Sequence, residues 1–257
     1  MIFGKIIKKL FYKLGYTIVD SRIYNPNDKN FIPYDIEEDF REIFLLCRPF
    51  TMTSVEKMYA MYKATEYLIK NEIAGDIVEC GVWKGGSMMI SALTLLRMNE
   101  TNRSLYLYDT YEGMAKPTAK DIKIFDKSSA IKSWNKKKKD DHVEWCYTSL
   151  EEVKKNLYST GYSKKNIKFI KGKVQDSIPN IIPEKISLLR LDTDLYESTY
   201  HELTYLYPKL MKKGILIIDD YGFWKGQKEA VDHYFQENNI NIFLNRIDEE
   251  GRITIKT

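Results

Sequence analysis

The feature that most constrains this chain is an apolar run of strand length that ends abruptly in acidic residues. Two stretches have this design, residues 186–194 (ISLLRLDTD) and residues 215–220 (ILIIDD). Continuous apolar runs of this length are typical of parallel strands that are buried on both faces. The first acid after each run, Asp192 or Asp219, is therefore expected at the carboxyl edge of a sheet, where open α/β folds bind ligands.

The rest of the chain alternates between strand and helix patterns, which predicts a Rossmann-like, doubly wound α/β domain over residues 71–257. The predicted strands are 76–81, 105–108, 167–170, 186–191, 215–218, 240–244 and 252–255. The predicted helices are 88–98, 150–159, 198–211 (ended by Gly214) and 227–236. We expect a mostly parallel, seven-stranded sheet with an antiparallel strand from a C-terminal hairpin that turns at 248–251.

Two segments lie outside this alternation. Residues 1–70 are predicted to form an N-terminal helical extension or lid, with helices at 37–48 and 54–70. Residues 110–150 are irregular and charged, which is typical of a lid or substrate loop. The lysine run at 136–139 within that loop is interpreted as a solvated face.

Residues 2–14 (IFGKIIKKLFYKL) carry apolar side chains at helical spacing with lysines between them. One interpretation is a helix that packs on the body of the protein or on another subunit. The other is a basic amphipathic helix that makes a peripheral contact with an anionic membrane surface. The pattern alone leaves both interpretations open.

Composition excludes several classes of function. A net charge of +4 over 257 residues gives no basis for expecting a nucleic-acid partner. Cys47, Cys80 and Cys146 are too few and too scattered for a disulfide framework or a zinc site, which favours a reducing compartment. No apolar run reaches transmembrane length, and the N-terminus lacks the pattern of a signal peptide. We expect a cytoplasmic protein, with the inner face of the membrane as the alternative location.

The first predicted strand enters a glycine-rich turn, E-x-G-x-x-x-G-G-S, over residues 79–87. A P-loop would need a lysine before Ser87, and an NAD site would need the spacing G-x-G-x-x-G. Glu79 can accept from a cationic amino group, and Asp109, which ends the second strand, is placed to bind ribose hydroxyls. S-adenosylmethionine (SAM) has both groups and no pyrophosphate, so the turn favours SAM. The alternative is a tight turn with an exposed acid.

Three acids, Asp192, Asp219 and Asp220, follow two neighbouring strands and are expected to converge on one point. Such a cluster repels itself unless a cation is bound, and an all-oxygen site suits Mg²⁺, or alternatively Mn²⁺ or Ca²⁺. The alternative is helix capping, which we assign to Asp194 and leave open for Asp220. A bound divalent metal would acidify a sugar hydroxyl, and a nearby carboxylate would take its proton.

Six motifs carry a family resemblance: RPFTMTS, DIVECGVWKGGS, LYDTYEGM, GKVQDSIP, LRLDTDLYEST and GILIIDDYGFWKGQKEAVDHYF. In this order, over about residues 40–245, they resemble the macrocin O-methyltransferase family, whose members are class I methyltransferases that use SAM and Mg²⁺ to methylate sugar hydroxyls. The resemblance implies cofactor contacts at Thr51, Met52, Thr53, Glu79, Gly81, Ser87, Asp109, Val174, Gln175 and Asp176. It implies metal ligands at Asp192, Asp219 and Asp220, with Asp192 also as catalytic base, and a homodimer or larger homo-oligomer.

The leading hypothesis is a SAM- and Mg²⁺-dependent O-methyltransferase of a sugar hydroxyl. Known members of the family act on antibiotic sugars in high-GC organisms, whereas this lysine-rich composition indicates a low-GC genome. We therefore expect a nucleotide-activated or glycan-linked sugar in surface-polysaccharide biosynthesis. The alternatives are a natural-product sugar of the macrolide or aminocoumarin type, a catechol-like small molecule, and a SAM-binding subunit or membrane-associated scaffold without turnover.

Overall fold

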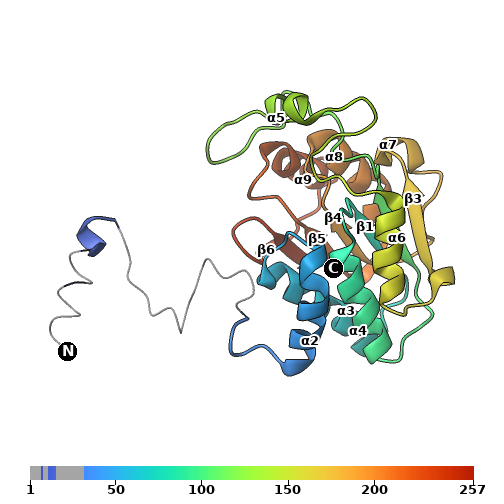
Figure 1. Cartoon of the computed structure of the whole chain (residues 1–257). Coiled ribbons are helices and arrows are strands. Elements are labelled where there is room, and N and C mark those ends of the chain that lie inside the picture. The colour runs from blue at the N-terminus through green and yellow to red at the C-terminus, as the bar shows by residue number, and fades with distance from the viewer. Residues whose placement is uncertain (1–6, 8–10, 16–31) are drawn as a thin grey trace. The chain divides into compact units, whose positions relative to one another are not determined.

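The computed structural model describes residue 7, residues 11–15 and residues 32–257 (Figure 1). The chain divides into two compact units, residues 1–36 and residues 37–257, which are considered separately. In the first unit, residue 7 and residues 11–13 are helical. The remainder of the helix predicted over 2–14, and the membrane contact predicted for it, lie outside the described residues. None of the described helices is both long and apolar enough to cross a membrane.

The second unit is built on one sheet of seven strands, which confirms the predicted fold class. The strands are β1 (Asp76–Cys80), β2 (Leu105–Asp109), β3 (Ile167–Lys171), β4 (Ile186–Leu191), β5 (Leu210–Ile218), β6 (Asn245–Arg246) and β7 (Arg252–Ile255). Their order across the sheet is β3-β2-β1-β4-β5-β7-β6. The first five pair in parallel, and β7 pairs antiparallel with both β5 and β6.

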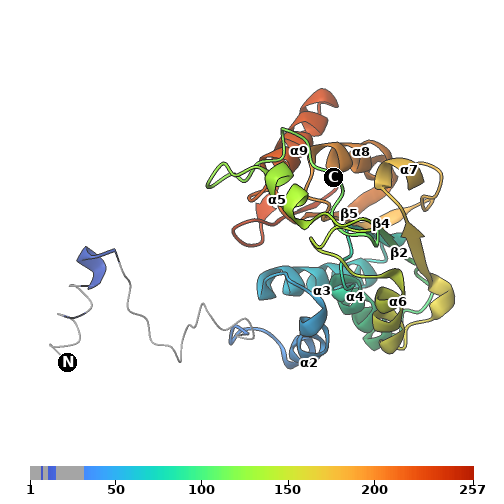
Figure 2. The same ribbon diagram turned by 45° about the horizontal axis from the view of Figure 1, so that its top comes forward.

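Helices cover both faces of the sheet (Figure 2). One face carries α2 (Glu38–Cys47), α3 (Val55–Lys70), α4 (Gly86–Arg97) and α6 (Leu150–Ser159), and the other carries α7 (Val174–Ser177), α8 (Tyr196–Leu206) and α9 (Lys225–Glu237). Short 3-10 turns lie at Arg48–Phe50, Lys164–Asn166 and Tyr207–Lys209. Helices α2 and α3, which were predicted to belong to a separate extension or lid, pack on α4 within the same compact unit as the sheet.

The central strands are buried as the sequence pattern predicts. All six residues of β4 are buried, and so are four of the five residues of β1. Apolar side chains fill the space between the sheet and its helices, but one β4 residue, Arg190, is charged and only 3% exposed. A buried guanidinium needs carboxylate partners, and these partners lie at the candidate site.

The prediction for the helix after β4 was wrong at its end. Helix α8 stops at Leu206 because Pro208, in the 3-10 turn that follows, cannot continue an α-helix. Residues 210–214, predicted as helix end and stop, belong to β5. Gly214 lies within that strand, where a Cβ would come within 2.8 Å of the backbone oxygens of Met211 and Ser187. Its role is close backbone packing, not helix termination.

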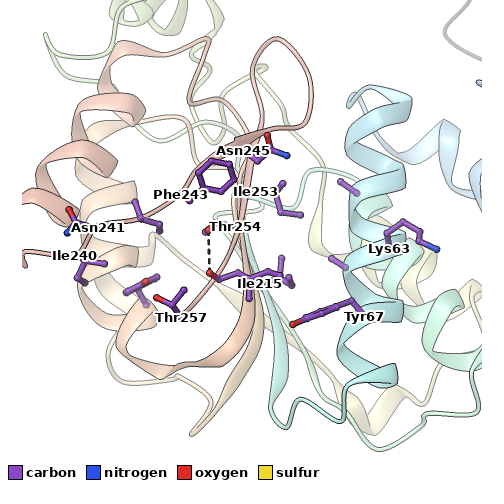
Figure 3. Close-up of a pocket in the computed structure, with 15 residues that line it drawn as sticks. Lys63, Tyr67, Ile215, Ile240, Asn241, Phe243, Asn245, Ile253, Thr254 and Thr257 are labelled. Carbon is purple, nitrogen blue, oxygen red and sulfur yellow. Dashed lines mark hydrogen bonds between the residues drawn. The ribbon is translucent and has the colours of Figure 1, made fainter.

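The prediction of a strand at 240–244 was also wrong. Those residues have no regular structure, and β6 is the two-residue strand that follows them. The side chains of residues 240–243 line an apolar cavity of about 540 Å³ together with residues of α3, β5 and β7 (Figure 3). This cavity is bounded by Ile215, at the middle of β5, and its lining residues include none of the predicted site residues. The antiparallel β6–β7 pairing nevertheless confirms the predicted C-terminal hairpin.

The segment 110–149 between β2 and α6 contains helix α5 (Ala130–Lys137) and lies beyond the carboxyl ends of the strands (Figure 1). It is tied to the loop after β5 by backbone hydrogen bonds from Ile124 to Phe223 and from Lys225 to Ile122, both 2.9 Å long. Asp121 is fully buried and accepts a hydrogen bond from the Tyr196 backbone N–H at the start of α8. This segment, hereafter the 110–149 loop, is thus anchored to the elements that carry the acids.

Candidate active site

The site forms where strand order reverses, between β1 and β4. Open parallel sheets hold their ligands at such a point, beyond the carboxyl ends of the strands. The Asp192 N–H donates to the Cys80 carbonyl at 2.8 Å, which continues the ladder past the end of β4. Gly81 follows with φ +84°, and a Cβ there would lie 2.1 Å from the Asp192 carbonyl oxygen. The glycine therefore lets the predicted cofactor turn and the predicted metal strand meet.

The predicted cofactor residues at 51–53 lie against this glycine turn. A Cβ on Gly86 would come within 2.5 Å of the Phe50 carbonyl oxygen and 2.7 Å of the Thr51 Cβ. Thr51 and Thr53 bond to each other through their hydroxyls, at 3.0 Å, and Arg48 donates to both of their carbonyls. Ser87 is buried in the first turn of α4, whereas Met52 is exposed. The RPFTMTS and glycine-rich motifs, far apart in sequence, therefore build one surface.

Asp109 lies at the end of β2 as predicted, but its carboxylate is engaged within the chain. It accepts from the backbone N–H groups of Val82 (2.7 Å), Trp83 (3.2 Å) and Tyr111 (2.7 Å). Burial raises the pKa of Asp109, and these hydrogen bonds oppose the rise. The side chain thereby holds the glycine turn in place, and its binding of ribose hydroxyls stays a prediction.

The last group of predicted cofactor residues forms the short helix α7 after β3. Val174 is buried in the apolar core, while Gln175 and Asp176 are exposed. Among the described residues, neither exposed side chain makes a hydrogen bond or ion pair with the other predicted site residues. The structure thus places these two at the carboxyl edge without linking them to the rest of the site.

Glu79 and Arg190 pair beneath this surface. The two side chains form an ion pair through Arg190 Nη1 and Glu79 Oε1, and both are almost fully buried. Burial raises the pKa of Glu79 to about 7, against the opposing effect of Arg190. The second Glu79 oxygen, Oε2, is buried and accepts no hydrogen bond from any described residue. An unsatisfied buried oxygen of this kind suits the ammonium group of SAM.

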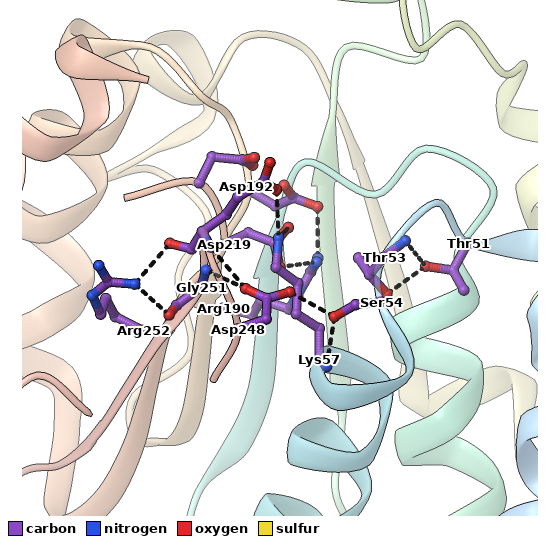
Figure 4. A network of polar contacts seen from close by, with 12 residues as sticks. Thr51, Thr53, Ser54, Lys57, Arg190, Asp192, Asp219, Asp248, Gly251 and Arg252 are labelled. Atoms are coloured by element: carbon purple, nitrogen blue, oxygen red, sulfur yellow. Dashed lines mark hydrogen bonds and ion pairs between the residues drawn. The ribbon is translucent and has the colours of Figure 1, made fainter. Parts of the chain in front are cut away.

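Arg190 also reaches two of the predicted metal ligands (Figure 4). Its guanidinium lies 2.8 Å from an Asp192 oxygen and 2.5 Å from Asp219 Oδ1. The other Asp219 oxygen lies 2.9 Å from Lys57 Nζ of helix α3, and Lys57 also lies 3.3 Å from Glu250. Burial would raise the pKa of Asp219, but Arg190 and Lys57 outweigh it and lower that pKa. Asp219 is therefore an ionised carboxylate held between two buried cations.

The carboxylates that converge are those of Asp192, Asp194 and Asp220. Each offers an oxygen, and these oxygens all lie within 4.8 Å of one another. Burial and the neighbouring carboxylates raise the pKa of Asp192 and of Asp220 well above their usual range. Burial and Asp192 raise the pKa of Asp194 to about 7. Three acids that oppose one another's ionisation form a donor set that fits a hard divalent cation.

The assignment of Asp194 to a helix cap was wrong. Leu195 occupies the N-cap position of α8, and it is Asp121 that accepts the hydrogen bond from the Tyr196 N–H, at 2.8 Å. Asp194 instead has φ +67° and is the centre of a three-residue turn closed by the Leu195 N–H and the Thr193 carbonyl, at 2.7 Å. The turn carries its carboxylate back toward Asp192. The capping alternative for Asp220 also fails, since Trp224 is the N-cap of α9.

The structure therefore brings together only part of the predicted set of metal ligands. Asp192 and Asp220 lie together as predicted, and Asp194 joins them, while Asp219 is occupied by Arg190 and Lys57. A carboxylate oxygen has two lone pairs, so ion pairing leaves Asp219 able to contribute to a metal as well. Sequence reasoning missed Lys57 and Arg190, although a signal existed. Arg190 is a charged residue in a strand that is otherwise largely apolar. Lys57 lies on the buried face of α3, together with Met61 and Leu68.

Comparison with known proteins places the chain in a family. Residues 46–254 match the model of the macrocin O-methyltransferase (TylF) family. The demethyldecarbamoylnovobiocin O-methyltransferase of Streptomyces niveus is 30% identical over 201 residues, which cover 78% of this chain and 73% of that protein. An 8-demethyl-8-(2,3-dimethoxy-alpha-L-rhamnosyl)-tetracenomycin-C 4'-O-methyltransferase of Streptomyces olivaceus is 28% identical over 95% of this chain and 91% of its own.

The fold of a solved relative agrees. The structure of the O-methyltransferase NovP superposes with a TM-score of 0.70 at 28% identity, and covers 81% of this chain and 82% of that one. The family match spans both acid-bearing strands, the glycine turn and the 110–149 loop. The chain therefore belongs to the macrocin O-methyltransferase (TylF) family and is a SAM-dependent O-methyltransferase.

Proposed function

We propose that this enzyme methylates a sugar hydroxyl and that a divalent metal, Mg²⁺ by preference, takes part. The observation that carries the proposal is the convergence of Asp192, Asp194 and Asp220 within 4.8 Å beside the glycine turn. Half-buried like charges at this spacing are unfavourable without a compensating cation. The carboxylate oxygens suit Mg²⁺, and Mn²⁺ and Ca²⁺ share that donor preference.

The residues would divide the chemistry as follows. When bound, Mg²⁺ would acidify and orient an acceptor hydroxyl. Asp192 and Asp220 would hold the cation beside Asp194, and Lys57 and Arg190, which both contact Asp219, would offset the negative charge of this neighbourhood. Glu79 Oε2, which no described residue satisfies, would accept from the SAM ammonium group. SAM held at the glycine turn would supply the methyl group and leave as S-adenosylhomocysteine, and a carboxylate of the cluster would take the proton of the acceptor hydroxyl.

Two acids are candidates for the proton acceptor. Asp192 is the residue predicted from the family resemblance, but Arg190 holds one of its oxygens at 2.8 Å. Asp194 forms no ion pair with any described residue, and its carboxylate lies in the same cluster. A carboxylate without a fixed cation is the better base, because its charge is not already stabilised. We therefore assign the base to Asp194 in preference to Asp192, and keep Asp192 as a ligand.

The acceptor is proposed to be a sugar of a natural product. The named relatives include an enzyme of novobiocin chemistry and one that methylates a rhamnosyl group of a tetracenomycin. They support this alternative better than the expected role in surface-polysaccharide biosynthesis, and neither name refers to a catechol. The half-buried Trp145 of the 110–149 loop, whose ring packs 5.9 Å from that of the buried Trp224, offers an apolar surface for such an acceptor.

The cellular setting is proposed from fewer observations. The three cysteines are free, which supports a reducing cytoplasm. A homo-oligomer stays a prediction, and so does a peripheral membrane contact of residues 2–14, a segment that lies largely outside the described residues.

An acceptor screen tests the proposed function. Purified full-length enzyme, SAM and Mg²⁺ would be offered natural-product glycosides, nucleotide sugars and catechols, with S-adenosylhomocysteine formation as the readout. We expect turnover with the glycosides, and methylation of a ring hydroxyl established by mass spectrometry and NMR. Turnover confined to nucleotide sugars would restore the polysaccharide hypothesis, and turnover confined to catechols would refute a sugar acceptor.

A further inference from the structure

A second carboxyl group is buried behind the acid cluster and takes no part in the assignments above. Glu202, on the inner face of α8, is fully buried. Its Oε1 accepts a hydrogen bond from the Thr193 hydroxyl at 2.8 Å, whereas its Oε2 is bonded to no described residue. No described lysine, arginine or histidine forms an ion pair with it. Burial raises the pKa of Glu202 to about 8, so that the side chain is a neutral acid near neutral pH.

Among the described residues, Thr193 is the one hydrogen-bond partner of Glu202. Thr193 lies between Asp192 and Asp194, and its carbonyl closes the turn at Asp194 by accepting from the Leu195 N–H. A γ-turn with positive φ is a rare and strained conformation for a residue other than glycine. Strained backbone of this kind persists only where the surrounding structure enforces it.

The other acids of the cluster are held by their own backbones. Asp192 donates its N–H to Cys80, and the Asp220 N–H donates to Gln227 Oε1, both at 2.8 Å. Within the described part of the chain, no backbone hydrogen bond of Asp194 itself is found. The direction of its carboxylate therefore depends on its side-chain hydrogen bond with Asp220 and on how its neighbours in the turn are fixed. Thr193 is the neighbour with a side-chain anchor.

We propose that Glu202 is a positioning residue, which fixes Thr193 and thereby holds the Asp194 turn so that its carboxylate faces Asp192 and Asp220. The proposal deepens the proposed function and rests on it, because it concerns the geometry of the same acid cluster. The proposal predicts which side chains can replace Glu202. The Thr193 hydroxyl needs a buried acceptor, and an amide oxygen serves as well as a carboxyl, whereas a hydrocarbon leaves the hydroxyl unsatisfied.

Four variants separate this role from simple packing. Glu202→Gln keeps an acceptor of the same shape, and Thr193→Ser keeps the donor. Glu202→Leu fills the space without an acceptor, and Thr193→Val removes the donor without touching the carboxyl. Thr199→Val is the matched control. Thr199 lies on the same helix, is fully buried, and its hydroxyl has no hydrogen-bond partner among the described residues, so its loss should change little.

The measurements are Mn²⁺ binding to each full-length variant by electron paramagnetic resonance, and kcat and KM for methyl transfer. We expect Glu202→Gln, Thr193→Ser and Thr199→Val to stay within about twofold of wild type in both. Glu202→Leu and Thr193→Val should each weaken Mn²⁺ binding and kcat by roughly 10- to 100-fold, with KM for SAM unchanged. The double variant Thr193→Val/Glu202→Leu should be no worse than the poorer single variant, because both remove one interaction.

Two results would overturn the positioning role: wild-type Mn²⁺ affinity and kcat in Thr193→Val, or a loss in Glu202→Gln as large as in Glu202→Leu. Should Glu202→Leu fail to fold, the Thr193 variants alone decide, because they leave the core carboxyl intact. Failure of the wild-type protein to bind Mn²⁺ would instead refute the metal in the proposed function. In that case the kcat comparison among the same variants still tests the role of Glu202.

Discussion

Lys57 Nζ lies 2.9 Å from Asp219 Oδ2, although 162 residues separate the two in sequence, and both side chains are about 5% exposed. The pair joins helix α3 to the end of β5. Ser54, which caps α3, strengthens the connection by donating to Asp248 at 2.6 Å. The helix that follows the predicted cofactor residues 51–53 is thus fastened to the acid-bearing edge of the sheet.

Replacing Lys57 by methionine should destabilise the protein by about 3–5 kcal/mol, because it removes one partner of a buried ion pair and leaves Asp219 undercompensated. The measurement is the free energy of unfolding in urea. Lys63→Met is the matched control, since Lys63 lies on the same helix with its side chain 44% exposed, and should cost less than about 1 kcal/mol. Equal effects of the two substitutions would contradict a buried, structural role for the Lys57–Asp219 pair.

Gly81→Ala should abolish SAM binding, because a Cβ there would lie 2.1 Å from the Asp192 carbonyl oxygen and force β1 and β4 apart. Gly161→Ala offers a control with nearly the same backbone conformation, φ +80° against +84°, but no atom within 4 Å of the new Cβ. The Gly161→Ala variant should lose only about 1–2 kcal/mol of stability, from the strain of the left-handed conformation. Its affinity for SAM, measured by calorimetry, should be unchanged. Retained affinity in Gly81→Ala would show that the turn and the strand are not in the described contact.

Asp121→Ala should loosen the 110–149 loop. The buried Asp121 carboxylate accepts from the Tyr196 N–H at 2.8 Å and from the Thr118 N–H at 2.7 Å, so its removal leaves both donors unsatisfied. We expect about 2–4 kcal/mol of lost stability from the two unpaired donors, together with faster limited proteolysis between residues 110 and 149. Asp126→Ala, an exposed acid of the same loop, is the control. Identical cleavage rates for both variants would show that Asp121 does not anchor the loop.

The pH dependence of stability should carry the signature of Glu202, whose pKa burial raises to about 8 from 4.5. The folded chain keeps this proton in a range where the unfolded chain releases it. The stabilisation is therefore full below about pH 4.5 and is lost as the pH rises through about 8. Because Glu202→Gln cannot ionise, its free energy of unfolding should fall less than that of wild type between about pH 5 and pH 8.5. Parallel pH profiles for the two proteins would show that Glu202 ionises normally.

Much of the fold could be predicted because its signals are local. Buried parallel strands produce apolar runs, and the serine that caps α3 and the glycines of the turn at 81–86 stand in the sequence itself. One error overlooked a local signal, because Pro208 ends α8 early. The other arose from tertiary packing, because residues 240–243 line a cavity instead of pairing in the sheet.

Part of the candidate site could likewise be predicted from the sequence. Asp192 and Asp220 could be found because strand ends of a parallel sheet meet at one edge. The position of Asp194 could not, since it depends on a positive φ that is unusual for aspartate. The cations that balance the acids were missed because Lys57 reaches Asp219 only through tertiary packing. A sequence pattern predicts the face of a helix or strand on which a side chain lies. It does not identify the residue of another element that this side chain contacts.

The most direct test of the account is the metal dependence of methyl transfer in wild type and in Asp220→Asn, with Asp232→Asn, an exposed acid on α9, as control. After removal of metals by EDTA, wild type and Asp232→Asn should lose turnover and regain it with Mg²⁺. Asp220→Asn should stay at least roughly 100-fold slower at any Mg²⁺ concentration. Full wild-type turnover in EDTA, or full turnover of Asp220→Asn, would contradict the claim that these acids form a metal centre for methyl transfer.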